Sequence, residues 1–160
     1  MLSIRPASDS DEAQLIVLIS NVFAEYPGCV MDVDGEIPEL RRIASYFSEH
    51  SGEFWVAERG DQVVGCIGYS PATDPTGIEL KKLYVDKNAR VGGLGSQLLE
   101  HVERAAEQRG ARFIDLWSDT RFHTAHGFYE KRGYKNTGTT RELHDKSDTV
   151  EFYFVKTLPA

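Results

Sequence analysis

Apolar residues recur along this chain with the spacing of helices in some segments and of strands in others. Leucine, isoleucine, valine and phenylalanine occupy positions 15, 16, 18, 19, 22 and 23, which predicts a helix that Tyr26-Pro27-Gly28 ends. Ser8 and Asp11 before it resemble a capping box, with the carboxylate near the helix N-terminus. A weaker helical pattern covers residues 38–50, and further helices are expected over residues 94–109 and 124–131.

Alternating or uninterrupted apolar runs predict the strands. Residues 53–58 and 62–69 flank Gly60-Asp61, a hairpin signal, so these two strands are expected to pair. Residues 78–85 lead through a glycine-rich turn into the helix over 94–109, and a strand over residues 112–117 follows. A strand, a helix and a strand in this order predict a parallel crossover. Three more strands are expected, at residues 2–5, 134–143 and 150–158.

This order of elements predicts an α/β fold with a mixed, mostly antiparallel central sheet of about seven strands and helices on both faces. The chain of 160 residues is long enough to bury one sizeable core, and no internal repeat, low-complexity tract or flexible linker divides it. We therefore expect residues 1–160 to form a single domain.

Composition and charge argue against several classes of protein. The net charge of −7 disfavours a nucleic-acid partner, and it suits either a cationic partner or an ordinary soluble protein. No stretch approaches the roughly 20 apolar residues that span a bilayer, so no membrane association is expected. The N-terminus lacks the pattern of a secretory signal, which favours a cytoplasmic protein with Cys29 and Cys66 reduced. Cysteines and histidines show no metal-ligand spacing, so no metal is expected.

A glycine-rich turn between the strand over 78–85 and the next helix is the strongest sign of chemistry. Glycine allows positive φ angles and lets the backbone approach a ligand closely. The first turn of a helix presents N–H groups without intrahelical partners and a partial positive charge, so turn and helix together suit a pyrophosphate. The turn runs Arg90-Val91-Gly92-Gly93-Leu94-Gly95-Ser96, and Arg90 adds a positive charge.

Two common phosphate-binding motifs do not fit this turn. The nucleoside triphosphate loop needs Gly-Lys-Ser/Thr where this chain has Gly95-Ser96-Gln97. The dinucleotide fingerprint needs a third small residue where this chain has Leu98. Taken alone, the glycines are also compatible with a simple turn at the entry to a helix.

Arg90-x-x-Gly93-x-Gly95 resembles the pyrophosphate loop of the GCN5-related N-acetyltransferases, which reads Gln/Arg-x-x-Gly-x-Gly/Ala. Leu83-Tyr84-Val85 is similar to the end of that family's fourth strand, and residues 125–134 are similar to its later segment Ala-x-x-x-Tyr-Glu-Lys-x-Gly-Phe/Tyr. The chain departs from the family at Phe122, where an asparagine often contacts the cofactor, and at Gly92, where a larger polar residue is common. The resemblance implies the acyl-CoA N-acyltransferase fold over nearly the whole chain.

The resemblance further implies an N-acetyltransferase that uses acetyl-CoA as cosubstrate. A primary amine would attack the thioester directly in a ternary complex, which calls for a general base and a general acid. Glu79 is the candidate base, because the family's glutamate lies six positions before the valine that is Val85 here. Tyr129 is the candidate acid, since the family places this hydroxyl near the coenzyme sulfur. Strand alternation predicts one shared face for Glu79, Lys81, Leu83 and Val85.

Two groups of residues are expected to bind the substrates. The main chain of the strand end and the amides of the turn would hold the coenzyme, so the predicted cofactor-binding residues are Leu83, Tyr84, Val85, Arg90, Val91, Gly92, Gly93, Leu94, Gly95 and Ser96. The side chain of Leu94 is expected in the core. In this family the acceptor site lies between the loop after the first helix and the last strands, which points here to Glu25, Tyr26, Asp32, Arg141 and His144.

Other functions stay open on the sequence. A domain of the same fold without turnover would bind acyl-CoA as a sensor or interaction module, with intact loop residues and a nonfunctional acceptor pocket. Taken singly, Glu79 is also compatible with a solvated charge and Tyr129 with a packed tyrosine. An enzyme with a longer acyl donor or an oxygen acceptor is a third alternative. The amine is not identified: an antibiotic, a polyamine, an amino acid and a protein amine all fit, and a homodimer is an assembly common among relatives.

Overall fold

The first four strands form an antiparallel meander. In the computed structural model, which describes residues 1–159, β1 (Leu2–Pro6) pairs with β2 (Glu53–Arg59), and β2 pairs with β3 (Gln62–Pro71). β3 pairs in turn with β4 (Ile78–Val85). Gly60 has a φ of 61° in the tight turn between β2 and β3, so the predicted hairpin is confirmed.

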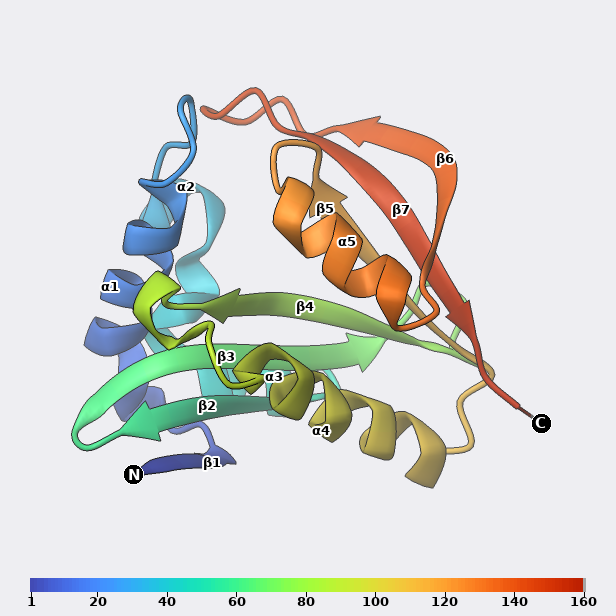
Figure 1. The fold of residues 1–160 in the computed structure, drawn as a ribbon, viewed down its shortest axis with the longest axis horizontal. Coiled ribbons are helices and arrows are strands. Elements are labelled where there is room, and N and C mark those ends of the chain that lie inside the picture. Colours follow the sequence, from blue (N-terminus) through green and yellow to red (C-terminus); the bar gives the residue numbers. More distant parts are fainter. Residues whose placement is uncertain (160) are drawn as a thin grey trace.

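The other three strands complete a mixed sheet. β5 (Phe113–Asp119) runs parallel to β4, β7 (Val150–Thr157) is antiparallel to β5, and β6 (Lys135–Glu142) is antiparallel to β7. The strand order is β1-β2-β3-β4-β5-β7-β6, and five of the six pairings are antiparallel. The predicted mixed, mostly antiparallel sheet of seven strands is therefore confirmed (Figure 1).

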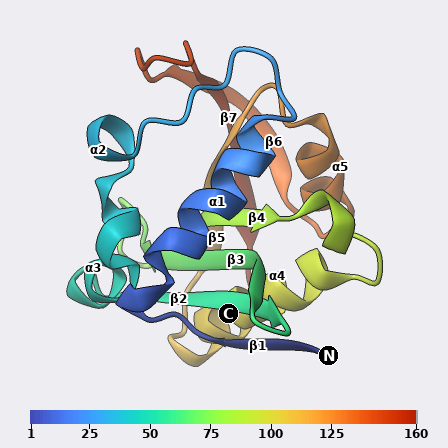
Figure 2. The ribbon, with the colours of Figure 1, turned by 90° about the vertical axis from the view of Figure 1, so that its left-hand side faces the viewer.

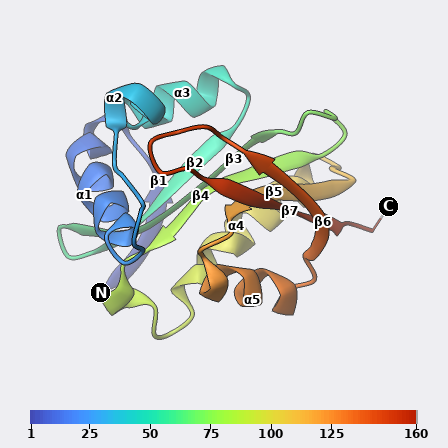
Figure 3. The same ribbon diagram turned by 90° about the horizontal axis from the view of Figure 1, so that it is seen from above.

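Helices cover both faces of this sheet, as expected. α1 (Glu12–Phe23) and α3 (Ile43–Glu49) lie on one side, and α4 (Leu94–Gln108) and α5 (His123–Lys131) lie on the other (Figure 3). Each layer has its own apolar core: Leu15, Ile43 and Phe54 belong to the first, and Leu98 and Leu116 belong to the second. No helix among residues 1–159 is both long enough and apolar enough to cross a membrane.

The predicted helix over residues 38–50 proved to be two elements. A 3₁₀ turn, η2 (Pro38–Arg42), precedes α3, and Arg42 between them has a non-helical φ of −150°. One short helix, α2 (Val33–Glu36), was not predicted, because a single turn of mostly polar residues carries no apolar period. Two further 3₁₀ turns are η1 (Asp9–Asp11) and η3 (Lys87–Ala89).

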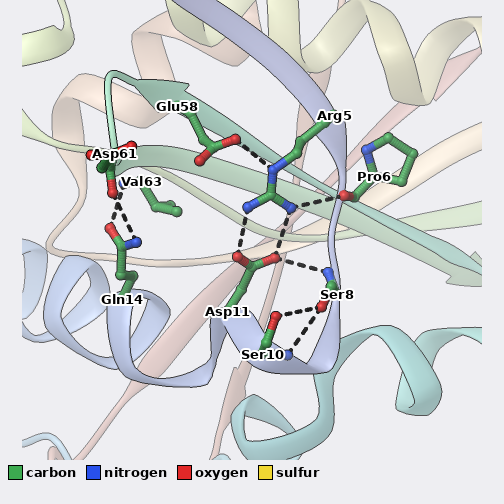
Figure 4. A network of polar contacts seen from close by, with 9 residues as sticks. All are labelled: Arg5, Pro6, Ser8, Ser10, Asp11, Gln14, Glu58, Asp61 and Val63. Atoms are coloured by element: carbon green, nitrogen blue, oxygen red, sulfur yellow. Dashed lines mark hydrogen bonds and ion pairs between the residues drawn. The ribbon is translucent and has the colours of Figure 1, made fainter.

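A polar network ties the N-terminal strand to the first helix and to the β2–β3 hairpin (Figure 4). The Arg5 guanidinium donates to both carboxylate oxygens of Asp11, at 3.0 and 2.7 Å, and to Glu58 at 2.6 Å. Asp11 also accepts the Ser8 amide at 2.8 Å, which completes the predicted capping box. The Gln14 side chain reaches main-chain groups of the β2–β3 hairpin. The pair of Arg5 and the buried Asp11 therefore joins β1, the start of α1 and β2.

Candidate active site

A cleft opens where β4 and β5 separate. The two strands pair through Ile78 with Ile114 and through Glu79 with Asp115, at the start of β4. Beyond these pairs the strands diverge, and within the described part of the chain residues 80–85 have no partner on β5 (Figure 1). The cleft has a volume of about 670 Å³ and is lined by β4, β5, the loop after α1 and the β6–β7 hairpin.

A bulge at Lys82 reverses the side-chain alternation of β4. Lys82 has a φ of 58°, and the register between β3 and β4 shifts at this point. Leu80 and Leu83 both pack against the core under α4, although residues three apart face opposite sides in a regular strand. We predicted one shared face for Glu79, Lys81, Leu83 and Val85, and this prediction is wrong. The bulge turns the side chains of Leu83 and Val85 to the face opposite to that of Glu79 and Lys81.

The half-buried side chain of Glu79 lies in the wall of the cleft. Burial raises the pKa of this carboxyl, Asp115 and Glu151 raise it further, and Lys81 and Arg141 oppose the shift. A carboxylate whose pKa is raised toward neutrality is a better proton acceptor at physiological pH. The environment of Glu79 therefore suits a general base.

Tyr129 reaches the same cleft from α5, on the other side of the sheet. Its side chain is 5% exposed, and its ring packs against Tyr134 and Phe154. Burial raises the pKa of the Tyr129 hydroxyl above its usual range, so the hydroxyl is protonated at neutral pH. The gap between β4 and β5 thus brings the candidate base and the candidate acid to one cavity.

The glycine-rich turn begins α4 with open space in front of it. Gly92 and Gly93 have φ values of 99° and 80°, and a Cβ atom on either would meet nothing within 4 Å. Gly93 is the N-cap of α4 and no side chain caps the first turn. The Leu94 side chain is buried as expected, while the Ser96 hydroxyl accepts hydrogen bonds from Arg132 of the next helix. Uncapped amides at the start of a 15-residue helix are therefore presented to an approaching anion.

Arg90 and Glu25 form a bidentate ion pair beside this turn. The guanidinium donates to both Glu25 carboxylate oxygens at 2.8 and 2.7 Å, and its Nε donates to the Val85 carbonyl at 3.0 Å. Glu25 therefore lies next to the turn that is expected to bind the coenzyme. Tyr26 packs on Phe122, with ring centroids 4.7 Å apart, and both line a small cavity of about 90 Å³ at the end of β4.

The far end of the cleft carries Arg141, Glu151 and Trp117. The Arg141 guanidinium contacts the Glu151 carboxylate at 2.7 Å and lies 4.1 Å from the centre of the Trp117 ring. Burial raises the pKa of Glu151, while the hydrogen bond from Arg141 works in the opposite direction. Asp32 also lines the cleft. The side chain of His144 is 81% exposed and does not line it.

The loop after α1 and the turn between β6 and β7 lie close together (Figure 2), and both contribute residues to the lining of the cleft. The Val30 amide donates to the Ser147 hydroxyl at 2.7 Å, and the Lys146 amide donates to Glu36 at 3.1 Å. The Lys146 ammonium also pairs with Asp32 at 2.8 Å. Hydrogen bonds and an ion pair thus join two segments of the cavity wall that are more than 100 residues apart in the sequence.

Comparison with known proteins identifies the family. Residues 19–134 match the model of the acetyltransferase (GNAT) family. The chain belongs to this family. A probable N-acetyltransferase 14 from Xenopus tropicalis is 35% identical over 102 residues, which cover 63% of this chain and 50% of that protein. The chain spans about half the length of the curated relatives it matches.

Solved structures of GNAT proteins share the fold over the whole chain. An acetyltransferase of the GNAT family from Staphylococcus aureus Mu50 superposes with a TM-score of 0.83 at 25% identity, covering 99% of this chain and 100% of that one. The PaiA N-acetyltransferase of Thermoplasma acidophilum, solved in complex with coenzyme A, has a TM-score of 0.75 at 19% identity and 99% coverage of both chains. The family and the fold predicted from the sequence are confirmed.

Three residues in or next to the cleft of this GNAT chain were not predicted from the sequence, namely Asp115, Trp117 and Glu151. A usable signal existed for Asp115, because it is a carboxylate between the apolar residues Ile114 and Leu116 of β5. No such signal marks Glu151, which acquires its place from the pairing of β7 with β5 and β6. Among residues 1–159, no three His, Cys, Asp or Glu side chains are grouped so that they would hold a metal ion.

Proposed function

We propose that this chain is an N-acetyltransferase that moves the acetyl group of acetyl-CoA to a primary amine in a ternary complex. One observation carries the proposal: the cavity between β4 and β5 is lined by both Glu79 and Tyr129. Membership of the acetyltransferase (GNAT) family supports the same activity.

The donor would bind along β4 and at the N-terminus of α4. The free edge of β4 offers main-chain groups of Leu83, Tyr84 and Val85 to the pantetheine arm, as a neighbouring strand would. The uncapped amides from Val91 to Ser96 face open space over Gly92 and Gly93, which suits the pyrophosphate. Arg90 would add a charged contact by exchanging part of its pairing with Glu25 for a phosphate.

Glu79 and Tyr129 would handle the protons of the reaction. Glu79 takes one proton from the substrate ammonium, and the neutral nitrogen attacks the thioester carbonyl. As the nitrogen–carbon bond forms and the carbon–sulfur bond breaks, Tyr129 gives its proton to the departing sulfur and regains one from the acetylated nitrogen. Each such transfer is typically worth about 10²–10⁴-fold in rate. The products are the acetylated amine, the coenzyme thiol and one proton on Glu79.

The acceptor would enter from the side of the α1–α2 loop and the β6–β7 hairpin. Carboxylates line this side, including Asp32, Asp145 and Glu151, and they favour a cationic amine. Arg141 is held by Glu151 and by the Trp117 ring, so its guanidinium is fixed at the end of the cavity, where it would orient an acceptor.

Thiol release from acetyl-CoA with a panel of amines tests this proposal. The panel should hold a polyamine, an aminoglycoside, amino acids and peptides with free N-termini or lysines. We expect at least one amine to raise thiol release well above the rate without amine, with a mass gain of one acetyl group on that amine. Tight binding of acetyl-CoA without amine-dependent release from any member would support the alternative, a module that binds acyl-CoA without turnover.

A further inference from the structure

Glu79 and Asp115 form the last residue pair that joins β4 to β5. The two residues are partners in the parallel register, so their side chains project from the same face of the sheet on strands about 4.8 Å apart. Glu79 lines the cleft, whereas Asp115 is 7% exposed and is not among the residues that line it. A buried carboxyl group therefore lies beside the candidate base on the adjacent strand.

One oxygen of Asp115 has no partner. The Tyr153 hydroxyl donates to Oδ2 at 2.6 Å, which leaves Oδ1 as the one buried side-chain nitrogen or oxygen atom of residues 1–159 without a hydrogen bond. Buried polar atoms in native proteins nearly always have a partner, so an unpaired carboxylate oxygen requires an explanation. The group that Oδ1 lacks is a hydrogen-bond donor.

Other charged groups around Glu79 do not supply that donor. Lys81 follows on the same strand, and Arg141 reaches the region from β6 but is engaged by Glu151 of β7. Tyr153 already donates to Asp115, and Asp74, whose charge also acts on Asp115, is a carboxylate and supplies no donor. A protonated Glu79 carboxyl, by contrast, carries an O–H group and belongs to the residue that pairs with Asp115 across the two strands.

We propose that Glu79 and Asp115 share one proton, and that Asp115, oriented by Tyr153, is a positioning residue that stabilises the protonated form of the base. The inference rests on the proposed function for its catalytic meaning. When Glu79 removes a proton from the substrate ammonium, the new O–H group donates to Oδ1 of Asp115, and that proton later returns to solvent. No other bond forms or breaks in this step. Two neighbouring carboxyls that hold one proton between them titrate as a pair.

Carboxyl titration of the protein alone tests the pair without any substrate. The chemical shifts of the ¹³C-labelled side-chain carboxyls of Glu79 and Asp115 are followed against pH in the wild type and in Asp115→Asn. We expect the substitution to lower the pKa of Glu79 by about one unit or more, since the second carboxyl is gone. Thermodynamic coupling is reciprocal, so Glu79→Gln should lower the pKa of Asp115 by the same amount. The second variant keeps the test available if Asp115→Asn does not fold.

Glu103→Gln is the matched control. Glu103 also accepts a tyrosine hydroxyl, that of Tyr134 at 3.2 Å, and pairs with Lys156, but it lies on α4. Its substitution removes one partly buried carboxylate and should leave the titration of Glu79 unchanged. An unchanged pKa of Glu79 in Asp115→Asn would overturn the proposal.

Turnover gives a second and separable result. With an active amine, the rising limb of kcat/KM against pH should move to lower pH in Asp115→Asn, in step with the carboxyl titration, because Glu79 must be ionised to accept a proton. If the pKa of Glu79 falls in Asp115→Asn but the rising limb of kcat/KM stays at the wild-type pH, the pair has no role in the reaction. If each substitution lowers the pKa of the other carboxyl but the protein acetylates no amine, the carboxyl pair is established and the proposed acetyltransferase activity is refuted.

Discussion

At the scale of single residues, burial governs the chemistry of the cleft. Glu79 and Tyr129 face one cavity, and burial raises the pKa of both groups. For the carboxyl, this shift improves a base. For the hydroxyl, it keeps the proton in place at neutral pH, so the group is in its protonated form when the carbon–sulfur bond breaks. The same low-polarity surroundings therefore suit opposite roles in the two groups.

Tyr129→Phe isolates the hydroxyl from the packing of its ring. We expect turnover to fall about 10-fold or more while the affinity for coenzyme A stays near that of the wild type, because the ring that packs against Tyr134 and Phe154 is retained. Steady-state kinetics and a coenzyme titration measure the two quantities. Tyr134→Phe serves as the control, since its hydroxyl bonds Glu103 away from the cleft. An unchanged kcat in Tyr129→Phe would exclude this hydroxyl as the acid.

At the scale of elements, the turn before α4 combines two properties that a phosphate site needs. Its glycines adopt positive φ angles, and the helix that follows leaves its first amides uncapped. Gly95 adds a third property, because a Cβ atom there would lie 3.2 Å from the Phe128 ring of α5, so that glycine allows α4 to pack closely on this ring. The turn and the two helices are therefore one unit.

Gly93→Val tests the anion site at this scale. We expect a loss of affinity for coenzyme A of about 10-fold or more, because the new side chain occupies the open space in front of the amides. Gly110→Val is the matched control: Gly110 also has a positive φ, of 68°, and a Cβ atom there would meet nothing within 4 Å, but it lies beyond the other end of α4. Calorimetric titration compares both variants with the wild type. Equal affinities for all three would place the pyrophosphate elsewhere.

The sequence predicted those parts of the fold and site that local patterns encode. Apolar patterns located the main helices and the strands other than β6, which has no apolar residue, and the spacing of Arg90, Gly93 and Gly95 marked the turn. The bulge at Lys82 escaped prediction, since its positive φ is supported by distant groups: Glu39 pairs with the Lys82 ammonium at 2.8 Å, and the Cys66 thiol donates to the Lys82 carbonyl at 3.2 Å. No glycine marks the position. Tertiary contacts of this kind leave no trace in a local window.

The contact between Asp115 and Tyr153 was beyond sequence reasoning for a related reason. The two residues are 38 positions apart, and their pairing depends on the register of β5 with β7. Glu25 illustrates the same limit: its place beside Arg90 follows from how the end of α1 packs near the end of β4, not from its neighbours in sequence. The sequence indicated Glu25 and Arg90 as site residues, but it did not predict that they pair with each other.

At the scale of the whole molecule, the protein is held together at two ends. The bridges from Ser147 and Lys146 to the loop after α1 join the last hairpin to the first half of the chain over the cleft. At the opposite end, the network around Asp11 joins β1, α1 and β2 (Figure 4). The first set of contacts lines the cleft, whereas Arg5, Asp11 and Glu58 do not line it, so the network around Asp11 reports stability without touching the candidate site.

Asp11→Asn should destabilise the protein in a pH-dependent way. Burial disfavours the Asp11 carboxylate, but the hydrogen bonds from the Arg5 guanidinium and the Ser8 amide outweigh it and lower the pKa of Asp11. A pKa lowered by folding contributes stability above the unfolded value of about 3.9, and this contribution is lost as pH falls toward the folded value. We expect Asp11→Asn to lower the free energy of unfolding by about 2 kcal/mol at pH 7, since a hydrogen-bonded charged partner is removed.

Urea unfolding at a series of pH values measures this difference. Below about pH 4 the unfolded chain takes up a proton at Asp11, whereas the folded protein stays ionised there until a lower pH, so the gap in stability between wild type and Asp11→Asn should narrow as the pH falls. Asp34→Asn is the control, because Asp34 also pairs with an arginine, Arg41, but its side chain is 78% exposed, and exposed pairs add little. A gap for Asp11→Asn that keeps its full size down to pH 3 would mean that shape and packing, and not the charge shared by three elements, make this residue important to the fold.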